Sequence, residues 1–225
     1  MNHFPKSSRL MIKTVLLIMM TFFSGIIYAE GLKTGDLIFQ IAGDSNFSRS
    51  ISEATYQDDT YDFVHVGIIE VVSDTIVNVI EASPEEGVRI ISLGDFIENV
   101  PLVEGKPGIV IKRVTQDLEF EKIIKLAYSH LGEDYDWWYM PQNNKMYCSE
   151  LIYECYLDPS GQHIFELEPM NFRASDGTMP EFWINLFNKL NCPIPEGIPG
   201  SNPNSLSRSP FLKTIEINLS KYMNE

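Results

Sequence analysis

Apolar stretches in the first half of the chain have the pattern of β-strands. The clearest is "FVHVGIIEVV" (63–72), a run rich in β-branched residues that is typical of a buried strand. Residues 74–83 form a second such run, and a turn at Ser73-Asp74 predicts that the two form an antiparallel hairpin. The other predicted strands are residues 32–42, which include a turn at Gly35-Asp36, residues 86–93 and residues 107–114.

The spacing of apolar residues changes to a helical period after these strands. A helix is predicted over residues 115–132, with Thr115 as its N-terminal cap and Gly132 at its end. The remaining predicted elements are a helix at 147–156, a helix at 178–190 opened by a capping box at Thr178–Glu181, a Pro-rich loop at 192–210 and a strand at 211–219. Strands followed by helices predict an α+β fold, in which an antiparallel sheet packs against helices.

The first 29 residues have the features of a secretory signal peptide. Three basic residues precede the uncharged run "TVLLIMMTFFSGIIYA" (14–29), which is shorter than the roughly 20 apolar residues that span a bilayer. We expect cleavage after Ala29 and export of residues 30–225, as a single domain, to the periplasm or the extracellular space. The alternative is that the segment remains as an uncleaved anchor.

The exported part is strongly acidic. The chain has 17 basic and 31 acidic residues and a net charge of −14, which becomes −17 when the three basic residues of segment 1–29 are removed. This charge argues against nucleic acid or an anionic lipid surface as a partner. It suits a cationic substrate, although solubility alone also accounts for it.

The cysteine content excludes a disulfide scaffold. Three cysteines, Cys148, Cys155 and Cys192, are too few for one in a chain of this length. An odd number leaves at least one thiol free, and a pair between Cys155 and Cys192 stays open. There is no C-x-x-C motif, and neither His130 nor His163 falls at ligand spacing with a cysteine, so we expect no zinc or other metal site and no cofactor.

Cys148, His65 and Glu81 each occupy a position that favours chemistry. Cys148 opens a predicted helix, where unpaired N–H groups and the helix dipole stabilise a thiolate. His65 and Glu81 lie in neighbouring apolar strands, where a buried carboxylate needs a partner. If Glu81 pairs with His65, the carboxylate orients the ring and the ring holds the thiolate, as in a Cys–His hydrolase. Taken singly, the three could also be a core cysteine, a core histidine and an exposed strand end.

Four segments, in this order, resemble the permuted papain-like amidases of the YiiX/YaeF type, a branch of the NlpC-type group. They are "GDLIFQ", "FVHVGI", "VIEAS" followed by "GV", and "LGEDYDWWY" followed by "YCSELIYECY". In the permuted branch the histidine strand precedes the cysteine helix, as here, and the tail "EFWINLFNKLNCPIPEGIPGSNPNSLSRSPFL" is similar too. The resemblance implies a circularly permuted papain-like fold over nearly all of residues 30–225.

The resemblance also implies roles for individual residues. Cys148 is the expected nucleophile, His65 the general base and Glu81 the residue that orients the base. Gln40, at the end of the first predicted strand, is either an oxyanion contact or a strand-end polar residue. Tyr147 adjoins the nucleophile and either lines the cleft or only packs.

Two further segments have open alternatives. The aromatic residues 137–139 form either a substrate wall or a cover for the core, since aromatic side chains are most often packing. The Pro-rich residues 193–203 either edge the cleft or form a plain surface connection.

The leading hypothesis for function is an exported cysteine amidase or peptidase that forms a thioester on Cys148. The resemblance suggests a bond in the peptidoglycan stem peptide, and an acidic cleft would suit the free amine of a lysine or diaminopimelate residue. One alternative is a thiol-dependent acyltransferase or lipid or ester hydrolase, against which the negative charge argues. Another is a non-catalytic exported binding module. We expect no nucleic-acid partner and no stable membrane insertion after signal cleavage.

Overall fold

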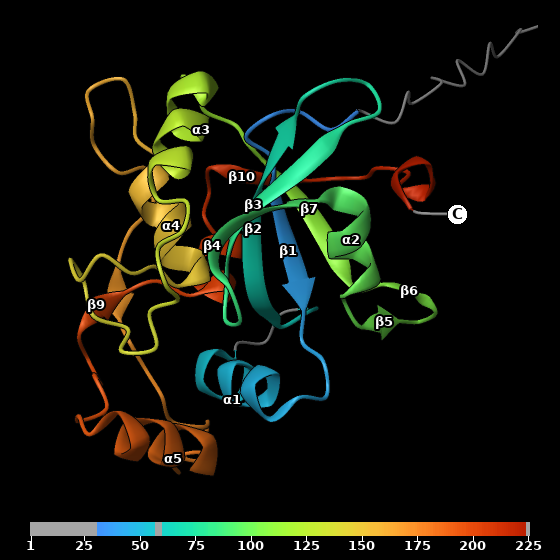
Figure 1. The fold of residues 1–225 in the computed structure, drawn as a ribbon. Coiled ribbons are helices and arrows are strands. Elements are labelled where there is room, and N and C mark those ends of the chain that lie inside the picture. The colour runs from blue at the N-terminus through green and yellow to red at the C-terminus, as the bar shows by residue number, and fades with distance from the viewer. Residues whose placement is uncertain (1–30, 57–59, 224–225) are drawn as a thin grey trace, which may run out of the picture.

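A six-stranded antiparallel sheet forms the centre of the computed structural model, which describes residues 31–56 and 60–223 (Figure 1). The strands lie in the order β10-β7-β1-β2-β3-β4, and each pairs antiparallel with its neighbour. Their bounds are β1 Leu37–Ile41, β2 Phe63–Val71, β3 Val77–Ser83, β4 Gly87–Ser92, β7 Ile109–Val114 and β10 Leu212–Ile215. The short strands are β5 Leu102–Val103, β6 Lys106–Pro107, β8 Glu168–Pro169 and β9 Pro199–Gly200.

Helices cover both faces of the sheet. They are α1 Asn46–Thr55, α2 Leu93–Glu98, α3 Phe120–Ser129, α4 Cys148–Cys155, α5 Glu181–Leu190, α6 Pro203–Ser207 and a 3-10 turn at Ser220–Tyr222. The helix α4 packs against β2 and β3 with α3 beside it, and α2 lies on the other side of the sheet (Figure 1). A larger apolar core lies with α3 and α4, and a smaller one lies with α2. The start of α4 is therefore held at a fixed place against the central strands.

The α+β fold class predicted from the sequence is confirmed, together with most of its elements. The predicted hairpin is formed by β2 and β3, in which Ile68 pairs with Ile80. The apolar residues of these strands are buried on both faces because each face meets a different core, which explains their nearly continuous apolar runs. The strand predicted over residues 86–93 is β4, and α2 follows it directly.

Two predicted helix starts are wrong. Thr115 does not cap α3, which begins only at Phe120, because its amide and hydroxyl both donate to the carbonyl of Phe211 and tie it to the end of the sheet. No capping box opens α5 either, because the Thr178 hydroxyl donates to Asp176 instead. In both cases another polar group takes the side chain that the helix would need. The helix α6 and the short strands were not predicted, since their segments are short and several are rich in Pro and Gly.

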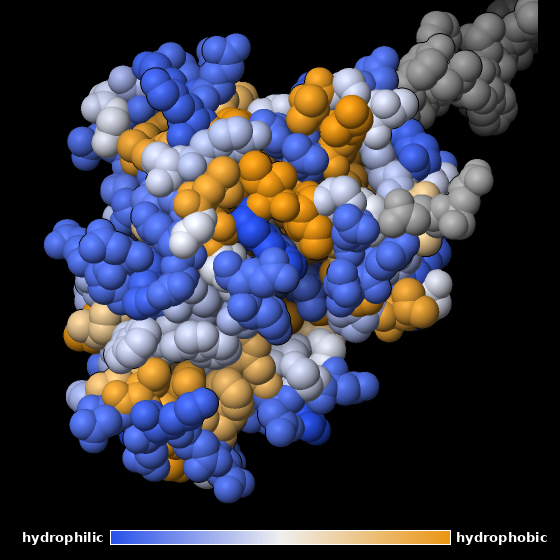
Figure 2. Space-filling view, viewed as in Figure 1, coloured by the Kyte–Doolittle hydropathy of each residue, from blue (hydrophilic) through white to orange (hydrophobic). Residues whose placement is uncertain are grey.

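The predicted signal peptide, residues 1–29, lies outside the described residues. Within residues 31–56 and 60–223, no helix is both long and apolar enough to cross a membrane. On the face in Figure 2, hydrophilic residues cover most of the surface, and apolar residues gather in its upper half and again near the bottom, where α5 lies in Figure 1.

Candidate active site

Cys148 is the first residue of α4 and is almost fully buried, with 4% of its surface exposed. The residue before it, Tyr147, is extended (φ −96°, ψ 166°), so the chain turns into the helix at the cysteine. The first N–H groups of a helix have no partner within it, and the helix dipole adds positive potential there. This setting favours a thiolate and offers hydrogen-bond donors to an oxyanion.

His65 and Glu81 come from adjacent strands, β2 and β3, and their side chains meet. Nε2 of His65 lies 2.6 Å from Oε2 of Glu81, and the two side chains are 12% and 5% exposed. Cys148 is among the groups that raise the pKa of His65, which places the cysteine beside the ring. Because Glu81 engages Nε2, Nδ1 is the ring nitrogen left for the thiol. The structure therefore brings together the three residues that the sequence analysis selected.

The surroundings of His65 favour a positively charged ring. Burial lowers the pKa of His65. The interactions of the ring with Cys148 and Glu81 outweigh burial and raise this pKa to about 10. Burial alone would raise the pKa of Glu81, yet its bonds with His65 and Arg89 hold the pKa of this carboxyl below its usual value. An imidazolium between two acidic groups is the partner that stabilises a thiolate nucleophile.

Arg89 belongs to the site and was missed in the sequence analysis. It lies opposite Glu81 in the β3–β4 register. Its Nε and Nη2 atoms lie 2.9 and 2.7 Å from Oε1 of Glu81, and its Nη1 atom lies 3.0 Å from Glu86. Arg89 therefore occupies one oxygen of Glu81 and leaves the other to His65. The register of the β3–β4 hairpin was the signal, since it sets the charged residue of "GVRIIS" directly across from Glu81.

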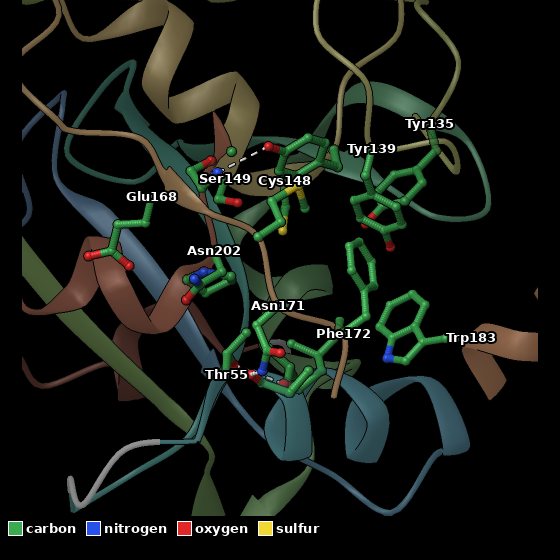
Figure 3. Close-up of a pocket in the computed structure, with 18 residues that line it drawn as sticks. Thr55, Tyr135, Tyr139, Cys148, Ser149, Glu168, Asn171, Phe172, Trp183 and Asn202 are labelled. Carbon is green, nitrogen blue, oxygen red and sulfur yellow. Dashed lines mark hydrogen bonds between the residues drawn. The ribbon is translucent and has the colours of Figure 1, made fainter. Parts of the chain in front are cut away.

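Two pockets adjoin these residues and differ in polarity. On the strand side, a cavity of about 470 Å³ is bordered by His65, Glu81 and Arg89. Other polar residues around it are Gln40, Ser45, Ser48, Ser83, Glu85, Glu86 and Asn99. On the helix side, a narrower pocket is bordered by Cys148 (Figure 3). Its walls are mostly apolar or aromatic and include Ile51, Val64, Tyr135, Tyr139, Phe172 and Trp183.

Gln40 and Tyr147, the two weaker candidates, border different pockets. Gln40 lies beside His65 in the β1–β2 register and borders the polar pocket. Tyr147 is buried and borders the apolar pocket, where its hydroxyl accepts a hydrogen bond from the amide of Ser201 at 3.1 Å. Their roles in catalysis stay predictions.

The aromatic segment is divided between the two roles that the sequence left open. Tyr139 borders the apolar pocket, whereas Trp137 packs against Phe47 and Tyr135, with ring centroids 5.4 and 4.8 Å apart. Residues 200–203, from the end of the Pro-rich loop and the start of α6, also border the pocket. One segment thus supplies both packing and pocket wall.

Tyr135 is a second residue of the site that the sequence analysis did not select. Burial raises the pKa of its hydroxyl well above the usual value, and the charges of Tyr139 and Cys148 add to that shift. Tyr135 and Cys148 border the same pocket. Nothing in the sequence distinguishes this tyrosine from its aromatic neighbours, because only the fold turns it toward Cys148.

The chain matches a known family over most of its length. The model of the permuted papain-like amidase enzymes, the YaeF/YiiX or C92 family, matches residues 31–216. The chain belongs to this family. Protein YiiX of Escherichia coli K12, described as uncharacterized, is 28% identical over 209 residues, which cover 90% of this chain and 95% of YiiX. The crystal structure of metalloprotein yiiX from Escherichia coli O157:H7 has a TM-score of 0.65 at 26% identity, and the match covers 83% of this chain and 97% of that one.

Membership of the permuted papain-like amidases makes this chain an amidase-type cysteine hydrolase by family. The chain order fits the permutation, since His65 lies on an early strand and Cys148 on a late helix. The resemblance found in the sequence is therefore confirmed at the level of family and fold.

The solved relative is described as a metalloprotein. Across residues 31–56 and 60–223, no group of three or more His, Cys, Asp or Glu side chains is arranged to hold a metal ion.

All three cysteines are free thiols, so the pair between Cys155 and Cys192 that the sequence left open is not formed.

Proposed function

We propose that this permuted papain-like amidase cleaves an amide bond through a thioester on Cys148. His65 acts as acid and base, and Glu81 orients His65. The observation that carries the proposal is the position of His65, which bonds to Glu81 at 2.6 Å and whose pKa is raised by the cysteine at the start of α4. This is the arrangement that an activated nucleophile requires, in which a base is in reach of the thiol and a third group holds the base.

The reaction follows from this arrangement in two steps. The Cys148 thiolate attacks the amide carbonyl carbon, and N–H groups at the start of α4 stabilise the oxyanion. His65 gives its proton to the leaving nitrogen as the C–N bond breaks, which leaves an acyl thioester on the sulfur and releases an amine. His65 then takes a proton from water, the hydroxide attacks the thioester, and the carboxylic acid leaves as the Cys148 thiolate is restored beside a protonated His65.

We propose that the enzyme is exported and that its substrates are peptidoglycan stem peptides. Two features support this proposal: the signal-like composition of residues 1–29, and the acidic residues around the polar pocket. Glu85 and Glu86 border the side from which His65 would protonate the leaving nitrogen. Carboxylates there suit a leaving group that carries a second, positively charged amine.

A second candidate is a substrate with an apolar acyl group, either an N-acyl amide or an ester. The apolar pocket favours this candidate, because its aromatic walls adjoin Cys148. The acyl carbon of the substrate bonds to the sulfur of this residue. Thiol-dependent ester hydrolysis or acyl transfer would use the same residues. The two candidates differ in the acyl half of the substrate, so substrates that vary in that half separate them.

The proposal is tested with purified protein comprising residues 30–225. Isolated peptidoglycan, soluble stem peptides and a series of N-acyl amides are incubated with the wild type and with Cys148→Ala, and products are identified by mass spectrometry. We expect wild-type digests alone to contain a new amine and a new carboxylic acid. The substrate that yields them decides between the two candidates.

Cys155→Ala is the matched control, because it removes the other buried thiol of the same helix. Cleavage that is lost in Cys148→Ala and retained in Cys155→Ala supports the nucleophile. Equal cleavage by wild type and Cys148→Ala contradicts it. A Cys148 that resists iodoacetamide in a protein that cleaves nothing supports the non-catalytic binding module. Fast alkylation without cleavage leaves the nucleophile standing and rules out only the substrates tested.

A further inference from the structure

Asp136 lies in the loop between α3 and α4, is fully buried, and binds three groups of that loop. Its Oδ1 atom accepts hydrogen bonds from the amide of Trp138 at 3.0 Å and from the side chain of Asn143 at 2.9 Å. Its Oδ2 atom accepts from the amide of Met140 at 2.8 Å. Burial of a carboxyl group is costly unless hydrogen bonds compensate for it, so these three bonds tie the loop around Asp136.

The two amides that Asp136 binds belong to the residues on either side of Tyr139. Tyr139 has a left-handed backbone (φ 52°), which is costly for a bulky residue and persists only where the surrounding structure enforces it. The bonds to Trp138 and Met140 therefore hold Tyr139 in a conformation that it would not adopt by itself.

The ring of Tyr139 is part of the aromatic wall of the apolar pocket (Figure 3). Its centroid lies 5.2 Å from that of Tyr147, 5.8 Å from that of Phe172 and 5.7 Å from that of Trp183. The nucleophile borders the same pocket, so the position of this ring sets the shape of the space beside the nucleophile.

We propose that Asp136 is a positioning residue that sets the specificity for the acyl half of the substrate. It holds the backbone of Tyr139, whose ring forms part of the pocket wall, and so determines how well an acyl chain packs beside Cys148. The inference rests on the proposed function, in which the acyl carbon bonds to the sulfur of Cys148. Without the bonds from Asp136, Tyr139 leaves its left-handed conformation and the wall no longer fits the chain.

The test measures how the pocket discriminates between chains and does not depend on turnover. Purified protein is treated with chloromethyl ketones whose alkyl group grows from methyl, in chloroacetone, to pentyl, and alkylation of Cys148 is followed by mass spectrometry. The thiolate displaces chloride from the carbon next to the carbonyl, so a C–S bond forms as the C–Cl bond breaks, and the alkyl group takes the place of the acyl chain. The chain preference is the rate with the fastest reagent divided by the rate with chloroacetone. The reactivity of the thiol itself cancels in this ratio.

We expect the wild type to have a chain preference of roughly ten-fold, about what two buried methylene groups provide. Asp136→Asn should lower it roughly three-fold, because the amide keeps the shape of the side chain but turns an N–H group toward one of the three donors. Asp158→Asn is the matched control. Asp158 also accepts three hydrogen bonds within a loop, from Ser160 and Gln162, but it lies beyond the other end of α4.

A double-variant cycle separates positioning of Tyr139 from a general effect on the fold. Tyr139→Gly removes the ring and the strain of the left-handed backbone. We expect it to keep part of the chain preference, because Phe172 and Trp183 remain in the wall. If Asp136 acts through Tyr139, adding Asp136→Asn to Tyr139→Gly causes no further loss.

Asn143→Ala gives a milder form of the same test, because it removes one of the three bonds to Asp136. We expect its chain preference to lie between those of the wild type and Asp136→Asn. It decides the question if Asp136→Asn does not fold.

The inference is overturned if the wild type shows no chain preference, or if Asp136→Asn, or Asn143→Ala in its place, keeps the wild-type preference. It is also overturned if Asp158→Asn loses as much, or if Asp136→Asn lowers the preference of Tyr139→Gly further. A Cys148 that none of the reagents alkylates overturns both the inference and the proposed nucleophile. Amide cleavage without a preference that depends on Asp136 contradicts the inference alone. Such a preference in a protein that cleaves no amide or ester contradicts the proposed function alone.

Discussion

Glu81 and Glu150 are buried to a similar degree, 4% and 7% exposed, but they lie on opposite sides of the site in opposite surroundings. On the strand side, burial would raise the pKa of Glu81, but hydrogen bonds with His65 and Arg89 lower it. On the helix side, burial and the charge of Asp136 raise the pKa of Glu150 to about 8, although a 3.4 Å bond from the amide of Tyr147 opposes the shift. Two carboxyls of the same type and depth thus differ in charge at neutral pH because their neighbours differ.

The same division extends to the two pockets. The strand side, with His65, Glu81 and Arg89, is charged and borders the polar pocket, whereas the helix side, with Cys148 and its tyrosines, borders the apolar pocket. An amide substrate has two halves, the acyl group that bonds to the sulfur and the amine that takes the proton of His65. The site therefore offers a different environment to each half, and substitutions on each side should change different observables.

The largest expected effect comes from His65→Gln, which removes the charged group that joins the two sides. We expect turnover and the alkylation of Cys148 at neutral pH to fall roughly 10³-fold, because the thiol loses its base and its counter-ion. The measurement is the rate of iodoacetamide alkylation against pH. His130→Gln is the control, since that ring pairs with Glu133 at 3.1 Å away from the site. An unchanged alkylation rate in His65→Gln would contradict the role given to this residue.

Glu81→Gln should have the next largest effect, roughly a hundred-fold on turnover, because the amide keeps the shape of the side chain and loses its charge. In the wild type, the pKa of His65 is raised to about 10, so the imidazolium is present below that pH and is lost as pH rises through it. Without the Glu81 charge the pKa of His65 falls. The basic limb of the pH profile of turnover should then move to lower pH.

The control for Glu81→Gln is Glu85→Gln, which removes a carboxylate from the same pocket. We expect its basic limb to coincide with that of the wild type. A Glu81→Gln profile that keeps the wild-type basic limb would mean that Glu81 does not set the charge of His65.

The sequence predicted the strand side better than the helix side. His65 and Glu81 were found because a polar residue inside an apolar strand is conspicuous, and neighbouring strands bring such residues together. Arg89 was missed although it is close to Glu81 in the sequence. Placing it opposite Glu81 requires the register of the β3–β4 hairpin. Thr115 was wrongly given a capping role because its partner, Phe211, is distant in the chain.

The helix side depends on contacts between distant segments. The pocket joins Ile51 of α1, Tyr135 and Tyr139 of the aromatic loop, and Ser201 near the end of the chain. No periodicity links these residues. Their composition predicted aromatic packing, but which of them would border the pocket depends on the final packing and not on any local pattern.

Arg89 gives a smaller effect that separates orientation from charge. We expect Arg89→Gln to lower turnover roughly ten-fold, because Glu81 loses the two bonds that fix its second oxygen. If Arg89 positions Glu81, its loss weakens the bond to His65, lowers the pKa of His65 and moves the basic limb to lower pH. If Arg89 acts only as a nearby cation, its loss raises the pKa of His65 and moves that limb to higher pH.

Arg89→Lys sharpens this test because it keeps the charge and loses the two-pronged contact. Under the positioning role its basic limb lies between those of the wild type and Arg89→Gln. Under the charge role it coincides with the wild type. Glu86→Gln is the control, since Glu86 touches Arg89 at 3.0 Å and has no part in holding Glu81.

The smallest effect on reactivity is expected from Glu150→Gln, whose main effect is on stability. The pKa of Glu150 in the folded protein, about 8, lies above its usual value of 4.5, so between these pH values the folded state binds a proton that the unfolded state has lost. The wild-type free energy of unfolding should therefore fall as pH rises through this window, relative to Glu150→Gln, which has no proton to lose. Denaturant unfolding at several pH values measures the difference, with Glu121→Gln, an exposed position on α3, as the control that loses one charge without burial. If the two curves for wild type and Glu150→Gln stay parallel from pH 5 to pH 8, Glu150 is ionised like Glu81, and the contrast between the two sides of the site is confined to their pockets.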